Sequence, residues 1–201
     1  MAPACPHCPA VLEALTRLLK EARIGRLEVV NVAAHPEDAA AAGTRSVPWT
    51  RLGPFVLEGL RSAAELGRWA AHAAAGTGAA DYLALLLEER RLDDAVASVR
   101  ETPGPLGELL RRAGEPDAPM GVRIGIAALV EELQGSDALA AALPALETLA
   151  GSEAAAVRAD AAHWLGLVGG QAAHALRPLL DDPNADVREI AAESLARLAA
   201  R

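Results

Sequence analysis

The sequence is poor in aromatic residues, with three Trp, one Tyr and one Phe among 201 residues. It also lacks long apolar runs, and none approaches the roughly 20 residues that span a bilayer. We therefore expect no membrane segment. We also expect no secretory signal, because a cysteine stands at position 5 with no basic, apolar and cleavage regions before it. The expected location is the cytoplasm.

Hydrophobic residues make up 52% of the chain, which is enough to bury a core and argues against disorder. Most of them are Ala and Leu, a composition typical of closely packed helices. Charge is unevenly placed: residues 1–78 hold 8 basic and 7 acidic residues, whereas residues 79–201 hold 11 basic and 20 acidic residues. The acidic second part would repel a phosphate backbone, so we expect no nucleic-acid partner.

The first part of the chain alternates helix and strand patterns. Apolar residues at helical spacing predict an amphipathic helix over residues 9–23. A β-rich run at residues 27–32 predicts a strand, and an Ala-rich helix is expected to begin at Pro36. Residues 50–57 predict a strand, a Gly-Pro turn and a second strand. A capping box at Ser62 then predicts the start of another helix.

The second part is predicted to be helical throughout. The Gly-Thr-Gly segment at residues 76–78 is the best domain boundary, with connecting helices expected over residues 79–102 and an internal repeat over residues 103–201. Each repeat has a Val-Arg pair after a polar or Pro-containing turn, with Ala five residues after the Val. One helix pair cannot bury its apolar face alone, so neighbouring pairs are expected to stack. The Val-Arg pairs stand at residues 122–123, 157–158 and 187–188.

This periodicity resembles HEAT repeats of the PBS-lyase type, over about residues 103–201. The resemblance implies an all-α solenoid of about three helix pairs whose surface binds protein partners. It also implies that the Arg after each Val bonds acidic residues of adjacent repeats. The matching residues are Arg123, Arg158 and Arg188. An ordinary helical bundle is the alternative.

The only two cysteines, Cys5 and Cys8, are three residues apart where a helix is expected to begin. Only a thiolate attacks a disulfide, and an ordinary thiol is mostly protonated at neutral pH, so a redox cysteine must be acidified. A helix N-terminus would favour the thiolate of Cys5, and His7 as an imidazolium would add to this effect. Cys8 lies one turn later on the same side of the helix. We therefore predict that Cys5 attacks and that Cys8 resolves the mixed disulfide.

Three features together resemble the thioredoxin/glutaredoxin superfamily over residues 1–76: the Cys-Pro-His-Cys motif, the helix and strand after it, and a Ser-Val-Pro segment before a hairpin. The resemblance implies an α/β thioredoxin-like fold and thiol–disulfide exchange without a cofactor. It implies that Pro48 is a cis-proline facing the disulfide and that Val47 offers its backbone to an extended substrate. Trp49 would flank the dithiol, or else pack on the sheet. The substrate-binding candidates are His7, Val47, Pro48 and Trp49.

The family places a β-strand immediately before its first cysteine. Here only four residues, one of them a proline, precede Cys5, and they cannot supply that strand. We expect a module without its first strand, either because the true start lies upstream of Met1, which we favour, or because the sheet has three strands. The strand at residues 27–32 would then expose a backbone edge.

Two other functions are alternatives to thiol–disulfide exchange. The repeats could form a non-catalytic scaffold in which the thioredoxin-like part is redox-inert. The cysteines could instead bind a metal with His7 or His35, although structural zinc sites usually have four ligands and no second Cys-x-x-Cys is present. We predict no metal site. Packing or surface roles are expected for His72, His163 and His174, and core positions for Trp69 and Trp164.

Overall fold

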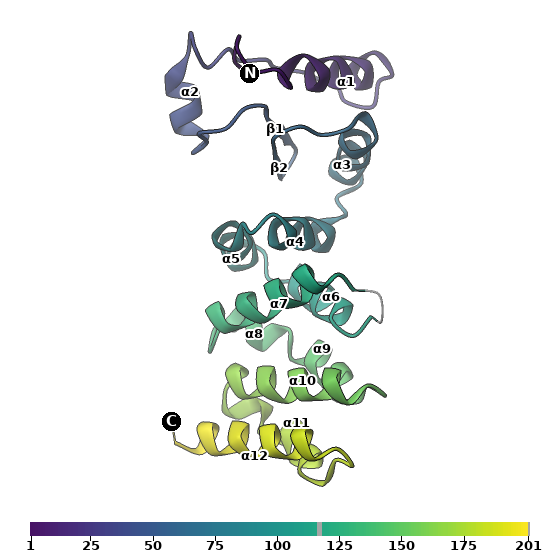
Figure 1. The fold of residues 1–201 in the computed structure, drawn as a ribbon, viewed down its shortest axis with the longest axis vertical. Helices are drawn as coiled ribbons and strands as arrows, with labels where there is room; N and C mark the ends of the chain where they lie inside the picture. Colours follow the sequence, from purple (N-terminus) through teal and green to yellow (C-terminus); the bar gives the residue numbers. More distant parts are fainter. Residues whose placement is uncertain (116–117, 201) are drawn as a thin grey trace. The chain divides into compact units, whose positions relative to one another are not determined.

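The computed structural model describes residues 1–115 and 118–200. The chain divides into two compact units, Met1–Gly78 and Ala79–Arg201 (Figure 1). The first unit combines three helices with a small sheet, and the second is built of helices over its described residues. Within the described ranges, no helix has the length and apolar character needed to cross a bilayer.

Two long helices form the main packing layer of the first unit. Helix α1 (Cys8–Lys20) is shorter than the predicted 9–23, because the chain turns at Glu21. It buries an apolar stripe against α3 (Ala63–Ala75). The Ser62 capping box that was predicted to begin α3 is confirmed. The short helix α2 (Pro36–Ala41) buries no residue. The stripe of α1 consists of Cys8, Val11, Ala14, Leu15 and Leu18.

The predicted hairpin is confirmed. Strand β1 (Trp49–Leu52) pairs antiparallel with β2 (Phe55–Glu58). Gly53, with φ of +59°, forms the turn because a left-handed residue is needed there. On the buried face, the Phe55 ring lies 4.9 Å from that of Trp69, which is 2% exposed. The core position predicted for Trp69 is therefore confirmed.

The strand predicted at residues 27–32 is wrong. Residues 27–31 have no regular secondary structure, although their composition favours a strand. A strand is stable only as part of a ladder, and among the described residues only Met1 pairs with this segment. The sheet of the described chain therefore has two strands, fewer than the three expected without the first strand.

The second unit is a succession of paired helices. They are α4 (Ala79–Glu88), α5 (Leu92–Glu101), α6 (Pro105–Arg112), α7 (Met120–Glu132), α8 (Asp137–Ala141), α9 (Leu143–Ala150), α10 (Ala155–Val168), α11 (Ala173–Leu176) and α12 (Ala185–Ala199). The helices predicted at the three Val-Arg pairs are confirmed as α7, α10 and α12. Their Val residues are buried, and α10 packs on both α9 and α12. Two short 3₁₀ segments, Gly170–Ala172 and Arg177–Asp181, flank α11.

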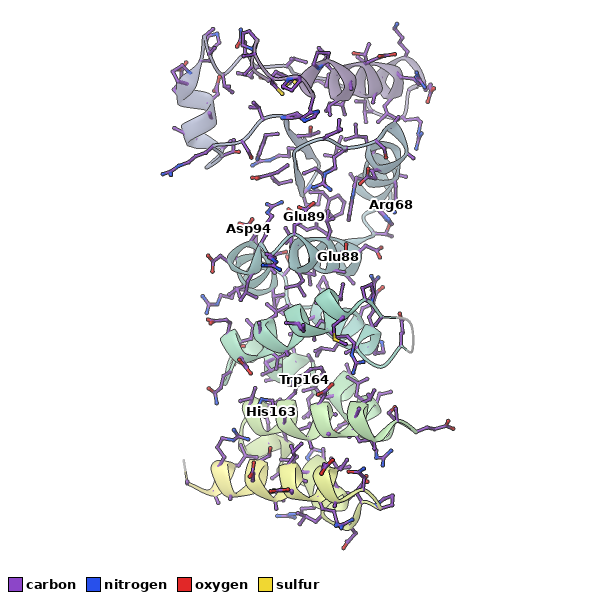
Figure 2. All side chains as sticks on the ribbon, viewed as in Figure 1. Arg68, Glu88, Glu89, Asp94, His163 and Trp164 are labelled. Atoms are coloured by element: carbon purple, nitrogen blue, oxygen red, sulfur yellow. The ribbon has the colours of Figure 1, made fainter. Side chains whose placement is uncertain are left out.

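Trp164 lies in the core of this unit, as predicted, and the two histidines of the unit lie at its surface. Trp164 is 3% exposed, which confirms its core position (Figure 2). His163 lies at the surface of the same helix, 3.9 Å from a carboxylate oxygen of Glu131. His174 is exposed, and its Nε2 lies 2.8 Å from Glu147.

The arginines after the Val residues bond neighbouring repeats in two of the three cases. Arg158 donates to both carboxylate oxygens of Asp182 at 2.7 and 2.8 Å, and Arg123 lies 3.6 Å from Asp160. Arg188 donates to the backbone carbonyl oxygens of Asp182 and Pro183 in the turn before its own helix. Arg158 makes the same two bonds, to Ser152 and Glu153, in addition to its ion pair. Within the described chain Arg188 forms no ion pair with a carboxylate, but its charge helps to lower the pKa of Asp182.

The ion pair between Arg158 and Asp182 should make the repeats acid-sensitive. Hydrogen bonds from Arg158 hold the pKa of Asp182 below its ordinary value. A carboxyl whose pKa is lower in the folded state stabilises the fold above its unfolded pKa, and this stabilisation is lost as pH falls through the folded pKa. Between about pH 5 and about pH 2, we expect the melting temperature of the wild type to fall more than that of Asp182→Asn.

The matched control for this prediction is Asp181→Asn, which changes the exposed neighbour in the same turn. It should follow the wild-type curve, as measured by calorimetry across that pH range. Parallel curves for wild type and Asp182→Asn would show that the ion pair does not contribute to the stability of the repeats.

Candidate functional site

The two cysteines lie at the N-terminal end of α1. Helix α1 begins at Cys8, so Cys5 lies in the turn before the helix rather than in its first turn. Cys5 is half-buried, Cys8 is 5% exposed, and both are free thiols. The first cysteine is therefore the accessible one, as an attacking thiol must be.

The sulfur of Cys5 accepts hydrogen bonds from the start of the helix. The backbone N–H of Cys8 donates to Cys5 Sγ at 3.2 Å. This N–H belongs to the first turn, whose amides have no partners within the helix. The Cys8 thiol and the backbone amide of His7 are further donors that favour the Cys5 thiolate and lower its pKa.

These donors make Cys5 the more acidic cysteine. Desolvation raises the pKa of Cys5, but the hydrogen bonds from the Cys8 thiol and from the His7 and Cys8 amides outweigh it and lower the pKa below its usual value. Burial raises the pKa of Cys8, and its hydrogen bond to Cys5 raises it further. Of the two thiols, Cys5 is therefore the one that ionises more readily.

The side chain of His7 is exposed and forms no hydrogen-bonded cap on α1. The backbone amide of His7 is one of the groups that lower the pKa of Cys5. The role expected for its side chain stays a prediction.

The segment before β1 lies against the cysteines. The Cys5 thiol donates to the carbonyl oxygen of Val47 at 3.6 Å, and the peptide bond between Val47 and Pro48 is cis. Residues 42 positions apart in the sequence therefore meet at the site. Trp49 follows as the first residue of β1, and the guanidinium of Arg51 lies 5.2 Å from its ring centroid.

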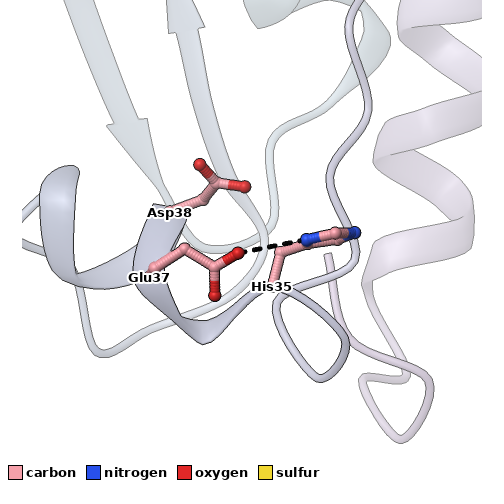
Figure 3. A group of neighbouring side chains, drawn as sticks. All are labelled: His35, Glu37 and Asp38. Atoms are coloured by element: carbon pink, nitrogen blue, oxygen red, sulfur yellow. Dashed lines mark hydrogen bonds and ion pairs between the residues drawn. The ribbon is translucent and has the colours of Figure 1, made fainter.

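A separate cluster of metal-type ligands lies at the start of α2. His35, Glu37 and Asp38 are exposed, and His35 Nδ1 lies 3.2 Å from a Glu37 oxygen (Figure 3). Neither cysteine belongs to a group of three or more such ligands in the described chain. In the described chain, the two cysteines therefore form no such group with His7 or His35, the histidines that were considered as metal ligands.

Sequence reasoning missed a cavity of about 470 Å³ in the first unit. It lies between residues 27–32 and β1, and Met1, Leu15 and Thr50 are among its lining residues. One feature of the sequence could have indicated this cavity. The run at residues 27–32 has the composition of a strand, but the residues before the Cys-Pro-His-Cys motif are too few to form the strand beside it.

The comparisons with known families agree with this geometry. Residues 1–71 match the family model of the thioredoxin domain, and residues 105–196 match that of HEAT repeats. Searches of curated proteins and of solved structures found no match. The Cys-x-x-Cys turn and the cis-proline segment lie within the first match, and the Val-Arg helices α7, α10 and α12 begin within the second. The chain therefore joins a thioredoxin-like module to HEAT-like helical repeats.

Proposed function

We propose that the protein exchanges thiols and disulfides through Cys5 and Cys8. The observation that carries this proposal is the half-buried Cys5 sulfur, which accepts the Cys8 N–H at 3.2 Å and whose pKa is lowered. A thiolate held at neutral pH is what disulfide attack requires.

The proposed reaction has two steps. The Cys5 thiolate attacks one sulfur of a substrate disulfide, and the other substrate sulfur leaves as a thiolate, which takes up a proton. Cys8 then loses its proton and attacks the Cys5 sulfur, so that the second substrate sulfur leaves and a Cys5–Cys8 disulfide forms. The substrate disulfide is reduced by two electrons and the protein dithiol is oxidised by two. The reverse sequence oxidises a substrate dithiol.

The substrate-binding roles of His7, Val47, Pro48 and Trp49 belong to this proposal. His7, with an exposed side chain, stands two residues after Cys5, and the carbonyl of the half-buried Val47 accepts the Cys5 thiol. An extended substrate would meet these residues as its sulfur approaches Cys5. Because the Val47 carbonyl accepts the Cys5 thiol, ionisation of Cys5 would free that carbonyl for a substrate N–H.

We further propose that the HEAT-like repeats, residues 103–201, are a docking surface for a protein partner. HEAT repeats generally mediate protein–protein interaction. The net negative charge of residues 79–201 favours a basic partner surface. The boundaries of 1–76, 79–102 and 103–201 and the cytoplasmic location stay predictions from the sequence.

Equilibration of the full-length protein with glutathione buffers of stepped ratio tests the proposal. We expect one intramolecular disulfide to form with a defined midpoint, measured by counting alkylated thiols by mass spectrometry. A Cys5→Ser protein, with one thiol, can form no such disulfide and is the control. If the wild type forms only glutathione adducts at every ratio, Cys8 does not resolve the mixed disulfide and the proposed two-step reaction is excluded. A protein that forms neither adduct nor disulfide would favour the redox-inert scaffold.

A further inference from the structure

Helix α7 carries apolar side chains on two opposite faces. The face that is buried in the stack consists of Val122, Ile126, Leu129 and Val130. On the other face, Met120 is 67% exposed and Ile124 is 63% exposed, the highest values among the large hydrophobic side chains of the described residues. The two residues stand about one turn apart, so their side chains form one apolar patch. Single exposed apolar residues are common on proteins, whereas adjoining ones indicate an interaction surface.

The stacking of the repeats does not require large apolar residues at these two positions. Met120 and Ile124 stand two residues before and two residues after the Val of their Val-Arg pair. The residues at the equivalent positions of the other two repeats are small or charged, namely Ala155 and Ala159 in α10 and Ala185 and Glu189 in α12. Those two helices pack in the stack without large apolar side chains there. The apolar patch of α7 is therefore a feature that the fold does not explain.

Acidic residues border the apolar patch. Glu131 stands on the same side of α7, about two turns after Ile124, and both Glu131 and Glu132 are exposed. Helix α7 packs beside α5 and α10 (Figure 1). Together these three helices carry six Asp or Glu residues, three Arg residues and one His. The charge of Arg123, next to Ile124, is balanced by Asp160 at 3.6 Å. The patch therefore lies on a surface of net negative charge.

This charge decides which occupant fits the patch. A second copy of the chain would bring the same acidic residues to the contact, and an anionic membrane would also be repelled. A segment with Lys or Arg beside apolar residues gains both the burial of apolar area and the attraction of opposite charges. Met120 and Ile124 are about 6 Å apart along the axis of α7, and Ile124 and Glu131 are about 10 Å apart. A helix lying along α7 repeats these spacings with its own side chains.

We propose that Met120 and Ile124 bind a basic amphipathic helix of a partner protein. The partner helix lies along α7 and places two apolar side chains, about one turn apart, on the apolar patch. A Lys or Arg about two turns further along that helix reaches Glu131. This proposal rests on the docking role proposed for the repeats and names its face and the chemistry of its partner. It is independent of thiol–disulfide exchange.

A capped helical peptide of about 16 residues is the probe for the full-length protein. It carries two leucines one turn apart and two lysines about two turns further along the same face. Methyl NMR should show the Met120 and Ile124 signals shifted at saturating peptide. The signals of Met1, which is the only other methionine, and of the buried Ile126 should not change. A peptide with glutamates in place of the lysines should shift none of them. Unchanged Met120 and Ile124 signals with millimolar lysine peptide would overturn the proposal.

Variants separate this face from the rest of the repeats. Met120→Ala combined with Ile124→Ala gives α7 the residues that α10 has at the equivalent positions, so the stack should stay folded. We expect about tenfold weaker peptide binding by fluorescence anisotropy. Leu180→Ala is the matched control, because it shortens another exposed apolar side chain of the same unit, and affinity should stay within about twofold.

The outcomes distinguish this proposal from the broader ones. Equal peptide affinity in the wild type and the double variant would refute this face but leave other surfaces of the repeats as docking sites. The double variant should form the Cys5–Cys8 disulfide at the wild-type midpoint, because the patch has no part in thiol exchange. Dimerisation of the wild type, or its binding to anionic lipid vesicles, that the double variant loses would assign the patch to a second copy or to a membrane and would refute the proposal.

Discussion

Replacing Cys5 with serine is expected to reduce disulfide turnover to the background rate of the assay. A hydroxyl does not replace a thiolate as the attacking group, and Cys8 cannot substitute because it is 5% exposed and burial raises its pKa. Turnover can be measured with the full-length protein, a protein disulfide and a thiol reductant. Activity equal to that of the wild type would exclude Cys5 as the attacking residue.

The Cys8→Ser protein is the matched variant, because it keeps the attacking thiol and loses the resolving one. It should accumulate a mixed disulfide with the substrate, visible on a non-reducing gel, while multiple turnover falls. In the wild type, the rate of the first step should rise with pH to a midpoint below the ordinary pKa of a cysteine, because hydrogen bonds, that of the Cys8 thiol first, hold the Cys5 pKa down. A midpoint at the ordinary value would remove the physical basis of the proposed function.

Gly166→Ala is expected to destabilise the second unit by about 1–3 kcal/mol. Gly166 lies in α10 where α12 packs closely, and an added Cβ would stand 2.7 Å from both Cβ and Oγ of Ser194. Ser194 is fully buried, so the helices must move apart to accept the methyl group. The free energy of unfolding from urea titration measures the effect.

Gly121→Ala is the control, because it makes the same change in a helix with open space around it. Removing a helical glycine there should stabilise the protein by about 0.5–1 kcal/mol. Adding Ser194→Gly to Gly166→Ala should restore part of the lost stability. Equal effects of Gly166→Ala and Gly121→Ala would mean that the contact between α10 and α12 is not tight.

The repeats were predictable because their evidence is local. Each Val-Arg pair follows a turn, and the helices at Val122, Val157 and Val187 formed where the periodicity placed them. The partners of Arg123 and Arg158 were also expected from position in the repeat, since stacking brings the same positions together each time. The bonds of Arg158 and Arg188 to two carbonyl oxygens of the preceding turn also recur at the same spacing, but they were not predicted from the sequence.

The strand predicted at residues 27–32 does not form, because a strand depends on contacts that are not local. Its composition is that of a strand, but β structure depends on a neighbour that supplies hydrogen bonds along its length. Only Met1 supplies any within the described chain. Residues 50–57, with similar composition, formed β1 and β2 because the turn at Gly53 gives each strand its partner.

The sequence by itself determined the two kinds of unit, the spacing of Cys5 and Cys8 and the helix that begins beside them, because these depend on neighbours a few residues away. Only the tertiary structure decided which sulfur is accessible, that the Val47 carbonyl accepts the Cys5 thiol and that a cavity lies next to β1. These features depend on burial and on contacts between distant segments. Local patterns do not encode the space left between segments that pack together only after the chain has folded.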